Sequence, residues 1–126
     1  MDMRSYFGRS RRTHAWSTDG GRTWTAPQDA PQLVEPICQA SIVRHEPNLL
    51  LFSNPADPKT RVRLTVKASD DDAKTWRDVA VLHAGPSAYS NLISLSATDA
   101  GCLYERGEKR PYEKITFARF SPGENL

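Results

Sequence analysis

The chain has 126 residues, of which 38% are hydrophobic and 25% charged, and its net charge is +2. That length is normal for one domain with a buried core, and the composition excludes an intrinsically disordered chain. The small net charge gives no reason to expect nucleic acid or anionic membranes as partners. No apolar run approaches the ~20 residues of a membrane span, and the first twelve residues lack the apolar centre of a signal peptide.

Short runs with strand composition follow one another along the chain. They predict strands over residues 13–17, 39–45, 48–53, 61–69, 78–83, 89–95, 101–105 and 114–120. Turns are expected between them, at the segments NPADP, DDDAKT, GPS, TDAG and RGEKRP. Alternation is clearest over 61–69, where four apolar residues should face the core: Val62, Leu64, Val66 and Ala68. Helical periodicity is nearly absent, so the sequence predicts an all-β fold.

An octet with the pattern S-x-D-x-(G/A)-x-T-W occurs twice. The copies, STDGGRTW at 17–24 and SDDDAKTW at 69–76, start 52 residues apart. Each copy follows one predicted strand and precedes another, which suits a hairpin turn. The aspartates, Asp19 and Asp71, are expected to accept hydrogen bonds from backbone amides of their own turns.

The fifth position of the octet differs between the two copies. It is Gly21 in the first copy, where glycine supplies a positive φ, and Ala73 in the second. An alanine in the left-handed region costs about 1–2 kcal/mol, so we expect the second turn to be the looser one. The tryptophan that ends each copy, Trp24 or Trp76, is expected to re-enter the core as the next strand starts.

The octets resemble the Asp-box repeat of sialidase-type β-propellers, whose blades are four-stranded sheets. At this blade length the chain makes about two and a half blades, with 1–32 ending one blade, 33–84 forming a second and 85–126 starting the last. Such a piece leaves open sheet edges, which proteins rarely tolerate. The resemblance therefore implies the C-terminal portion of a six-bladed propeller, a ring that usually takes its missing strand from the N-terminus.

Four further segments, in order along the chain, extend the resemblance to the exo-α-sialidases (neuraminidases). They are MRS at 3–5, TRVRLTVKAS at 60–69, AYS at 88–90 and LYERG at 103–107. The resemblance implies a hydrolase that releases terminal sialic acid from glycoconjugates with retention, through a tyrosyl intermediate. Sialylated glycans are then the expected partners. A sialyl-transferring relative stays an alternative.

The resemblance assigns Arg4 and Arg61 to a cluster of three arginines that binds the carboxylate of sialic acid. Guanidinium groups suit this role because they bind a carboxylate bidentately and stay charged. The third arginine of the family has no counterpart in this sequence. Two alternatives remain open: Arg4 is an ordinary member of an arginine-rich end, and Arg63, on the same face of the predicted strand, takes the place of Arg61.

Tyr89, in AYS, matches the nucleophile of the family. A carboxylate nucleophile would be repelled by the substrate carboxylate beside the reacting carbon, whereas a neutral phenol is not, provided that a base takes its proton. Sialidases are known for this use of tyrosine. The alternative is a half-buried strand tyrosine. Asn91 stands where family members commonly have aspartate.

Two more residues match the family by position. Glu105, in LYERG, corresponds to a glutamate that braces an arginine of the cluster, and the alternative is a rim carboxylate paired with Arg106 or Arg110. Gln39, in PICQASI, corresponds to a glutamine that lines the sugar pocket. Glu35, four residues earlier, is interpreted as a loop charge.

Several other residues and motifs limit the chemistry that is expected. Cys38 and Cys102 are interpreted as buried thiols, with a single disulfide as the alternative. The three histidines lack ligand spacing, so neither a metal nor a cofactor is expected.

The catalytic glutamate base and aspartate acid of the family have no counterpart here. Such groups each contribute about 10²–10⁴-fold in rate, so the chain alone is expected to be inactive. The rival hypothesis is a non-catalytic carbohydrate-binding or interaction module built from Asp-box blades. Cellular location is left open, although relatives are often secreted.

Overall fold

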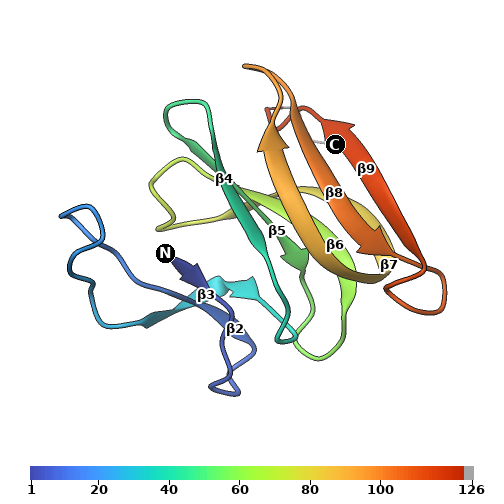
Figure 1. The fold of residues 1–126 in the computed structure, drawn as a ribbon, viewed down its shortest axis with the longest axis horizontal. Coiled ribbons are helices and arrows are strands. Elements are labelled where there is room, and N and C mark those ends of the chain that lie inside the picture. The colour runs from blue at the N-terminus through green and yellow to red at the C-terminus, as the bar shows by residue number, and fades with distance from the viewer. Residues whose placement is uncertain (124–126) are drawn as a thin grey trace.

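The structure is a computed structural model that describes residues 1–123, and these residues form strands and turns only. The strands are β1 (Asp2–Met3), β2 (Arg11–His14), β3 (Gln28–Val34), β4 (Ser41–His45), β5 (Leu49–Pro55), β6 (Val62–Ser69), β7 (Arg77–Ser94), β8 (Ala100–Arg106) and β9 (Lys114–Phe120). They make a three-stranded antiparallel sheet, β1-β2-β3, and a curled six-stranded sheet, β4-β5-β6-β7-β8-β9 (Figure 1). The all-β prediction is confirmed.

The long strand β7 belongs to both halves of the larger sheet. Its first part pairs with β6, and its second part pairs with β8 from Ser87 onward. The segment GPS was expected to be a turn, and that prediction was wrong. Ser87 donates its N–H to the Arg61 carbonyl, and the Pro86 carbonyl accepts from Gly107. A proline fits here because the ladder changes partner at this point, so its missing N–H disrupts no regular pairing. The expected blade boundary between residues 84 and 85 falls inside β7, and the three blade ranges stay a prediction.

Two strands carry no clear signal in the sequence. β1 has only two residues, and β3 contains Pro31. Proline is tolerated in β3 because this strand lies at the edge of its sheet, next to β2 alone. The pairing of β3 with β2 is irregular, and the buried residues Ala30 and Leu33 are three positions apart, so the alternation by which strands are recognised is missing.

The core consists of two clusters of apolar side chains, and the larger one is made by residues of the six-stranded sheet alone. Three of the four residues expected to face the core, Leu64, Val66 and Ala68, are fully buried in the larger cluster, whereas Val62 is only half-buried and lies outside it. Thr65 on the opposite face is buried as well, so β6 is covered on both faces. The smaller cluster joins the two sheets and consists of Ala30, Leu33, Phe52 and Trp76.

Both octets form the turns that the sequence predicts. In the second copy the Asp71 carboxylate accepts hydrogen bonds from the Lys74 amide (3.1 Å), the Thr75 amide (2.9 Å) and the Thr75 hydroxyl (2.7 Å). These bonds, with that of Ser69, lower the pKa of Asp71 to about 2, and the equivalent bonds from Thr23 and its neighbours do the same to Asp19. Charged carboxylates are held by amides in this way because the charged form is the better acceptor.

The backbone of the fifth octet position is left-handed in both copies. Gly21 has a φ of 88° and Ala73 a φ of 68°. Ala73 therefore has the left-handed backbone that is strained for an alanine. Whether the second turn is the looser one stays a prediction.

The two octet tryptophans differ, and the prediction for Trp24 was wrong. Trp76 is 8% exposed and packs on Phe52 at 5.7 Å between ring centroids, whereas Trp24 is 45% exposed. Trp76 is buried because Ala30 and Leu33, from β3 of the three-stranded sheet, pack in the same cluster. Trp24 belongs to the first sheet of the described chain, and only the Gly21 carbonyl accepts from its indole N–H, at 3.0 Å.

Cys38 and Cys102 are buried free thiols, as expected, and the alternative disulfide is not formed. Burial raises the pKa of Cys102 to about 11. Over residues 1–123, no helix with the length and apolar character of a membrane span is found.

Candidate functional site

Three of the predicted residues come together at one end of the strand pair β7–β8. Gln39, Tyr89 and Glu105 line a cavity of about 290 Å³, with Leu103 and Ile115 forming apolar walls. Gln39 comes from the segment before β4, Tyr89 from β7 and Glu105 from β8. Residues separated by up to 66 positions in the sequence thus share one hollow.

Tyr89 lies on the surface of this hollow. Its side chain is 44% exposed, so a ligand can reach the phenol. The guanidinium of Arg61 stands over its ring, 5.7 Å from the centroid. A positive charge at this distance favours negative charge on whatever binds or reacts at the phenol.

Arg61 is fixed by two hydrogen bonds before any ligand is present. Its Nη1 donates to the Tyr112 hydroxyl at 2.7 Å, and its Nη2 donates to the Ile37 carbonyl at 3.3 Å. Two of its five N–H donors are used in this way, and the others can meet a carboxylate. Tyr112 was not foreseen, because nothing in the turn RGEKRP suggests a partner 51 residues away.

Arg61 and Arg63, the alternative candidate, lie at different places on the surface. Arg63 has a φ of 60° and stands at an irregularity in the pairing of β6 with β7. It lines a different hollow, together with Lys67 and Asp78. The expectation that both arginines share one face was wrong, because the irregularity breaks the alternation between them.

Arg4 lies near the same region. Ser5, the next residue, donates its amide to Glu35 at 2.8 Å, and Glu35 is two residues before Ile37, whose carbonyl accepts from Arg61. Burial raises the pKa of the Cys38 thiol, and the positive charges of Arg61 and Arg4 oppose that rise. Arg4 also stacks over the ring of Tyr6 at 5.1 Å. Its Nε is buried and has no hydrogen-bond partner among the residues that the structure describes.

Gln39 and Glu105 make contacts different from those that the resemblance implies. Gln39 donates to the Ser90 carbonyl at 2.9 Å and accepts from the Ser90 amide at 3.0 Å. Glu105 accepts from the Tyr89 amide at 3.0 Å. Within residues 1–123, no arginine forms an ion pair with Glu105, and neither Arg106 nor Arg110 is its partner. The brace and the sugar contact stay predictions.

Glu35 lies in the loop after β3, as interpreted, but its carboxylate is buried and paired instead of exposed to solvent. One oxygen accepts from the Ser5 amide at 2.8 Å, and the other accepts from Arg12 at 2.8 Å. The pair is almost fully buried. Because Ser5 follows Arg4, Glu35 ties the segment that carries Arg4 to the loop before Gln39. Sequence alone does not reveal it, since its partner lies 23 residues away.

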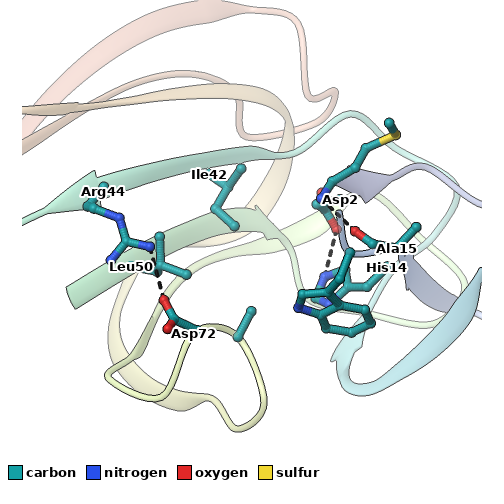
Figure 2. Close-up of a pocket in the computed structure, with 10 residues that line it drawn as sticks. Asp2, His14, Ala15, Ile42, Arg44, Leu50 and Asp72 are labelled. Carbon is teal, nitrogen blue, oxygen red and sulfur yellow. Dashed lines mark hydrogen bonds and ion pairs between the residues drawn. The ribbon is translucent and has the colours of Figure 1, made fainter. Parts of the chain in front are cut away.

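A second hollow, of about 360 Å³, lies between the two sheets (Figure 2). Asp2 and His14 form its buried polar wall, with 3.1 Å between the carboxylate and Nε2, while Arg44 and Asp72 pair across its exposed side. Burial would raise the pKa of Asp2, but the hydrogen bonds from His14 and Arg12 outweigh it and lower that pKa. None of the predicted site residues reaches this hollow.

Comparison with known proteins decides the family. Residues 1–102 match the BNR repeat-like domain family. Over 85% of the present chain, its sequence is 35% identical to that of Sialidase-3 of Bos taurus. Over 82% of the present chain, it is 34% identical to the sialidase of Micromonospora viridifaciens. The chain belongs to the sialidase family of BNR-repeat proteins.

The fold of this sialidase-family chain agrees with a solved relative. The Hadza microbial sialidase Hz136 superimposes on 95% of the chain with a TM-score of 0.79 and 36% identity. The nine strands are therefore part of a sialidase-type β-propeller. The chain spans 27%, 18% and 24% of the lengths of these three relatives, respectively.

Proposed function

We propose that this sialidase-family chain supplies the nucleophile and part of the carboxylate-binding cluster of a glycosidase that releases terminal sialic acid from glycoconjugates. The observation that carries the proposal is the Arg61 guanidinium standing over the exposed ring of Tyr89. An arginine fork beside a reachable phenol suits a sugar whose anomeric carbon bears a carboxylate. The match of the family over most of the chain supports the same substrate class.

In the proposed reaction, Arg61 and Arg4 bind the substrate carboxylate, which brings the anomeric carbon to the Tyr89 oxygen. A base takes the phenol proton as a bond forms between that oxygen and the carbon, while the bond to the aglycone oxygen breaks and the aglycone takes a proton from an acid. Water then attacks the same carbon, the bond to Tyr89 breaks, and the phenol regains its proton. Two displacements at one carbon give retention of configuration.

The proposed reaction also requires an acid and a base. Neither the base that takes the phenol proton nor the acid that protonates the aglycone has a counterpart in this sequence. Each contributes about 10²–10⁴-fold in rate, so we expect negligible turnover by residues 1–126 alone. Activity is expected of a longer protein in which these residues form the last part of a six-bladed ring.

The test is turnover of a fluorogenic sialoside by the full-length protein and its Tyr89→Phe variant. We expect kcat to fall at least about a thousandfold in the variant, because the nucleophile is lost while the ring is kept. Normal turnover by Tyr89→Phe would exclude Tyr89 as the nucleophile. A folded full-length protein that binds sialosides without hydrolysing them would instead favour the non-catalytic binding module.

Arg61 and Arg63 provide a matched pair for the carboxylate contact. Arg61→Lys keeps the charge but loses the bidentate fork, so KM should rise about tenfold to a hundredfold. Arg63→Lys should leave KM unchanged, because Arg63 lines a different hollow. Equal effects of the two substitutions would contradict the assignment of Arg61.

A further inference from the structure

The pairing of β7 with β8 is irregular at Tyr89 itself. Ser87 pairs with Arg106 and Ser90 pairs with Tyr104, so two residues of β7, Ala88 and Tyr89, stand opposite one residue of β8. This two-against-one arrangement is a β-bulge, which breaks the ladder locally and changes the direction in which a side chain points. The backbone groups at the bulge therefore need partners other than the neighbouring strand.

Side chains supply these partners on both edges of β7. On the β8 side, the carboxylate of Glu105, the residue opposite the bulge, accepts the Tyr89 amide at 3.0 Å. On the other edge, the Gln39 side chain both donates to and accepts from the backbone of Ser90, at 2.9 and 3.0 Å. Two side chains, one from the segment before β4 and one from β8, thus hold the backbone next to the phenol.

The Gln39 contact leaves little freedom for the residue after Tyr89. A primary amide that bonds both the N–H and the C=O of one residue imitates a neighbouring strand. The Ser90 hydroxyl is held as well, at 2.8 Å from that of Ser53, and the side chain is buried. Ser90 is therefore a fixed point from which Tyr89 projects.

We propose that Gln39 and Glu105 are positioning residues that fix the bulge presenting Tyr89, Gln39 through the Ser90 backbone and Glu105 through the Tyr89 amide. This inference rests on the proposed function for its catalytic consequence, although the contacts themselves do not depend on it. It gives Gln39 a role other than contact with the sugar. The hydrogen bond from the Tyr89 amide to Glu105 needs an acceptor oxygen but no negative charge. An ion pair between Glu105 and an arginine would need the charge, so the two roles can be distinguished.

Hydrogen exchange of individual amides in the full-length protein tests the contacts without any substrate. Gln39→Met keeps the length of the side chain but removes both hydrogen bonds, so the Ser90 amide should exchange about tenfold faster. Glu105→Met should have the same effect on the Tyr89 amide, whereas Glu105→Gln retains an acceptor oxygen and should stay within about twofold of wild type. Amides of the β8–β9 ladder serve as the internal control and should not change.

Kinetics with the fluorogenic sialoside separate positioning from sugar binding. Gln39→Met should lower kcat about tenfold or more with KM within about twofold, because a displaced nucleophile affects the chemical step. A rise in KM with kcat unchanged would overturn the positioning role of Gln39 in favour of sugar contact. A Glu105→Gln variant as impaired as Glu105→Met would overturn the role of Glu105 in favour of its charge.

The two proposals fail in different ways. Unchanged exchange at Ser90 and Tyr89 in both methionine variants, with an active wild type, would overturn the positioning proposal and leave the sialidase function standing. A wild type that turns over no sialoside would overturn the proposed function, while faster exchange in the variants would still support the contacts.

Discussion

At the scale of single residues, the arginine that faces Tyr89 is set in place by the protein itself. Ile37, whose carbonyl accepts from Arg61, has a φ of 56°, which is strained for a β-branched residue by about 1–3 kcal/mol. Tyr112, the other partner, follows a turn in which the Glu113 carboxylate accepts three backbone amides, those of Glu108, Lys109 and Arg110. A guanidinium held in advance loses less freedom when it binds a carboxylate.

Removing the Tyr112 hydroxyl tests this arrangement. In Tyr112→Phe, Arg61 loses the acceptor of its Nη1, so we expect KM for the sialoside to rise about threefold to tenfold with the melting temperature unchanged. Tyr6→Phe is the matched control, since the ring that stacks on Arg4 is kept and the Tyr6 hydroxyl makes no hydrogen bond to any of residues 1–123. An unaltered KM in Tyr112→Phe would show that Arg61 does not depend on the phenol.

Acid stability is a second property of single residues, here the octet aspartates. Hydrogen bonds lower the pKa of Asp71 to about 2, below its ordinary value of 3.8. A folded-state pKa below the unfolded one gives stability that is present above about pH 4 and lost as the pH falls toward 2. Asp71→Asn should therefore melt lower at neutral pH and show a flatter dependence of melting temperature between pH 4 and 2.

The neighbouring Asp70 provides the control for that measurement. It is exposed and makes none of the hydrogen bonds of the turn, so Asp70→Asn should keep the wild-type pH dependence. If Asp71→Asn and wild type lose stability in parallel over this window, the turn carboxylate does not contribute to acid sensitivity.

At the scale of elements, the second octet carries an alanine where the backbone favours glycine. Ala73→Gly relieves the left-handed strain of about 1–2 kcal/mol but adds flexibility to the unfolded chain, so we expect a net stabilisation of about 0.5–1 kcal/mol. Chemical denaturation measures the difference. Ala68→Gly, at a buried position within β6, should destabilise instead. A destabilised Ala73→Gly would mean that the packing of its methyl group on the smaller core cluster outweighs the strain.

Most elements of the fold were predictable from the sequence, and the exceptions have a common cause. Strands β4, β5, β6, β8 and β9 are short segments of strand composition between clear turn residues, and the structure has them near the expected positions. β7 was divided in two because Gly85 and Pro86 resemble a turn, although they mark a change of pairing partner. β3 was missed because its two buried apolar residues, Ala30 and Leu33, are three positions apart and so do not follow the two-residue period of a strand.

Only those residues of the candidate site that match sialidase motifs were predictable from the sequence. Arg61, Gln39 and Tyr89 are indicated by short motifs, and the structure brings all three together. Tyr112 and Glu35 were not recognised as partners, because their importance lies in contacts with distant residues that no local pattern encodes. The bulge at Tyr89 is likewise a property of pairing between two strands.

At the scale of the whole molecule, the last three strands expose an apolar face. Ile93, Leu103 and Phe117 are each about half exposed and lie around Gly101, where the Phe117 ring leaves no room for a side chain. β9 also forms the edge of its sheet. Unpaired edges beside apolar surface promote association between chains.

Residues 1–126 expressed alone should therefore self-associate. Light scattering during size-exclusion chromatography should show aggregates, and Phe117→Lys should reduce them by placing a charge in the apolar face. Val81→Lys is the control, because Val81 is 46% exposed in β7 and outside this face. A monodisperse monomer that melts cooperatively would contradict the expectation.

The shared strand β7 has a consequence for how such a molecule can be divided. Its 18 residues run without interruption from the β6 pairing to the β8 pairing. Cutting or permuting the chain between residues 84 and 85, where the sequence repeat ends, would sever one strand and weaken the sheets on both sides of the cut. The repeating unit of the sequence is thus not a unit that can be exchanged, and swaps between relatives should join at the loop between β6 and β7 or that between β8 and β9 instead.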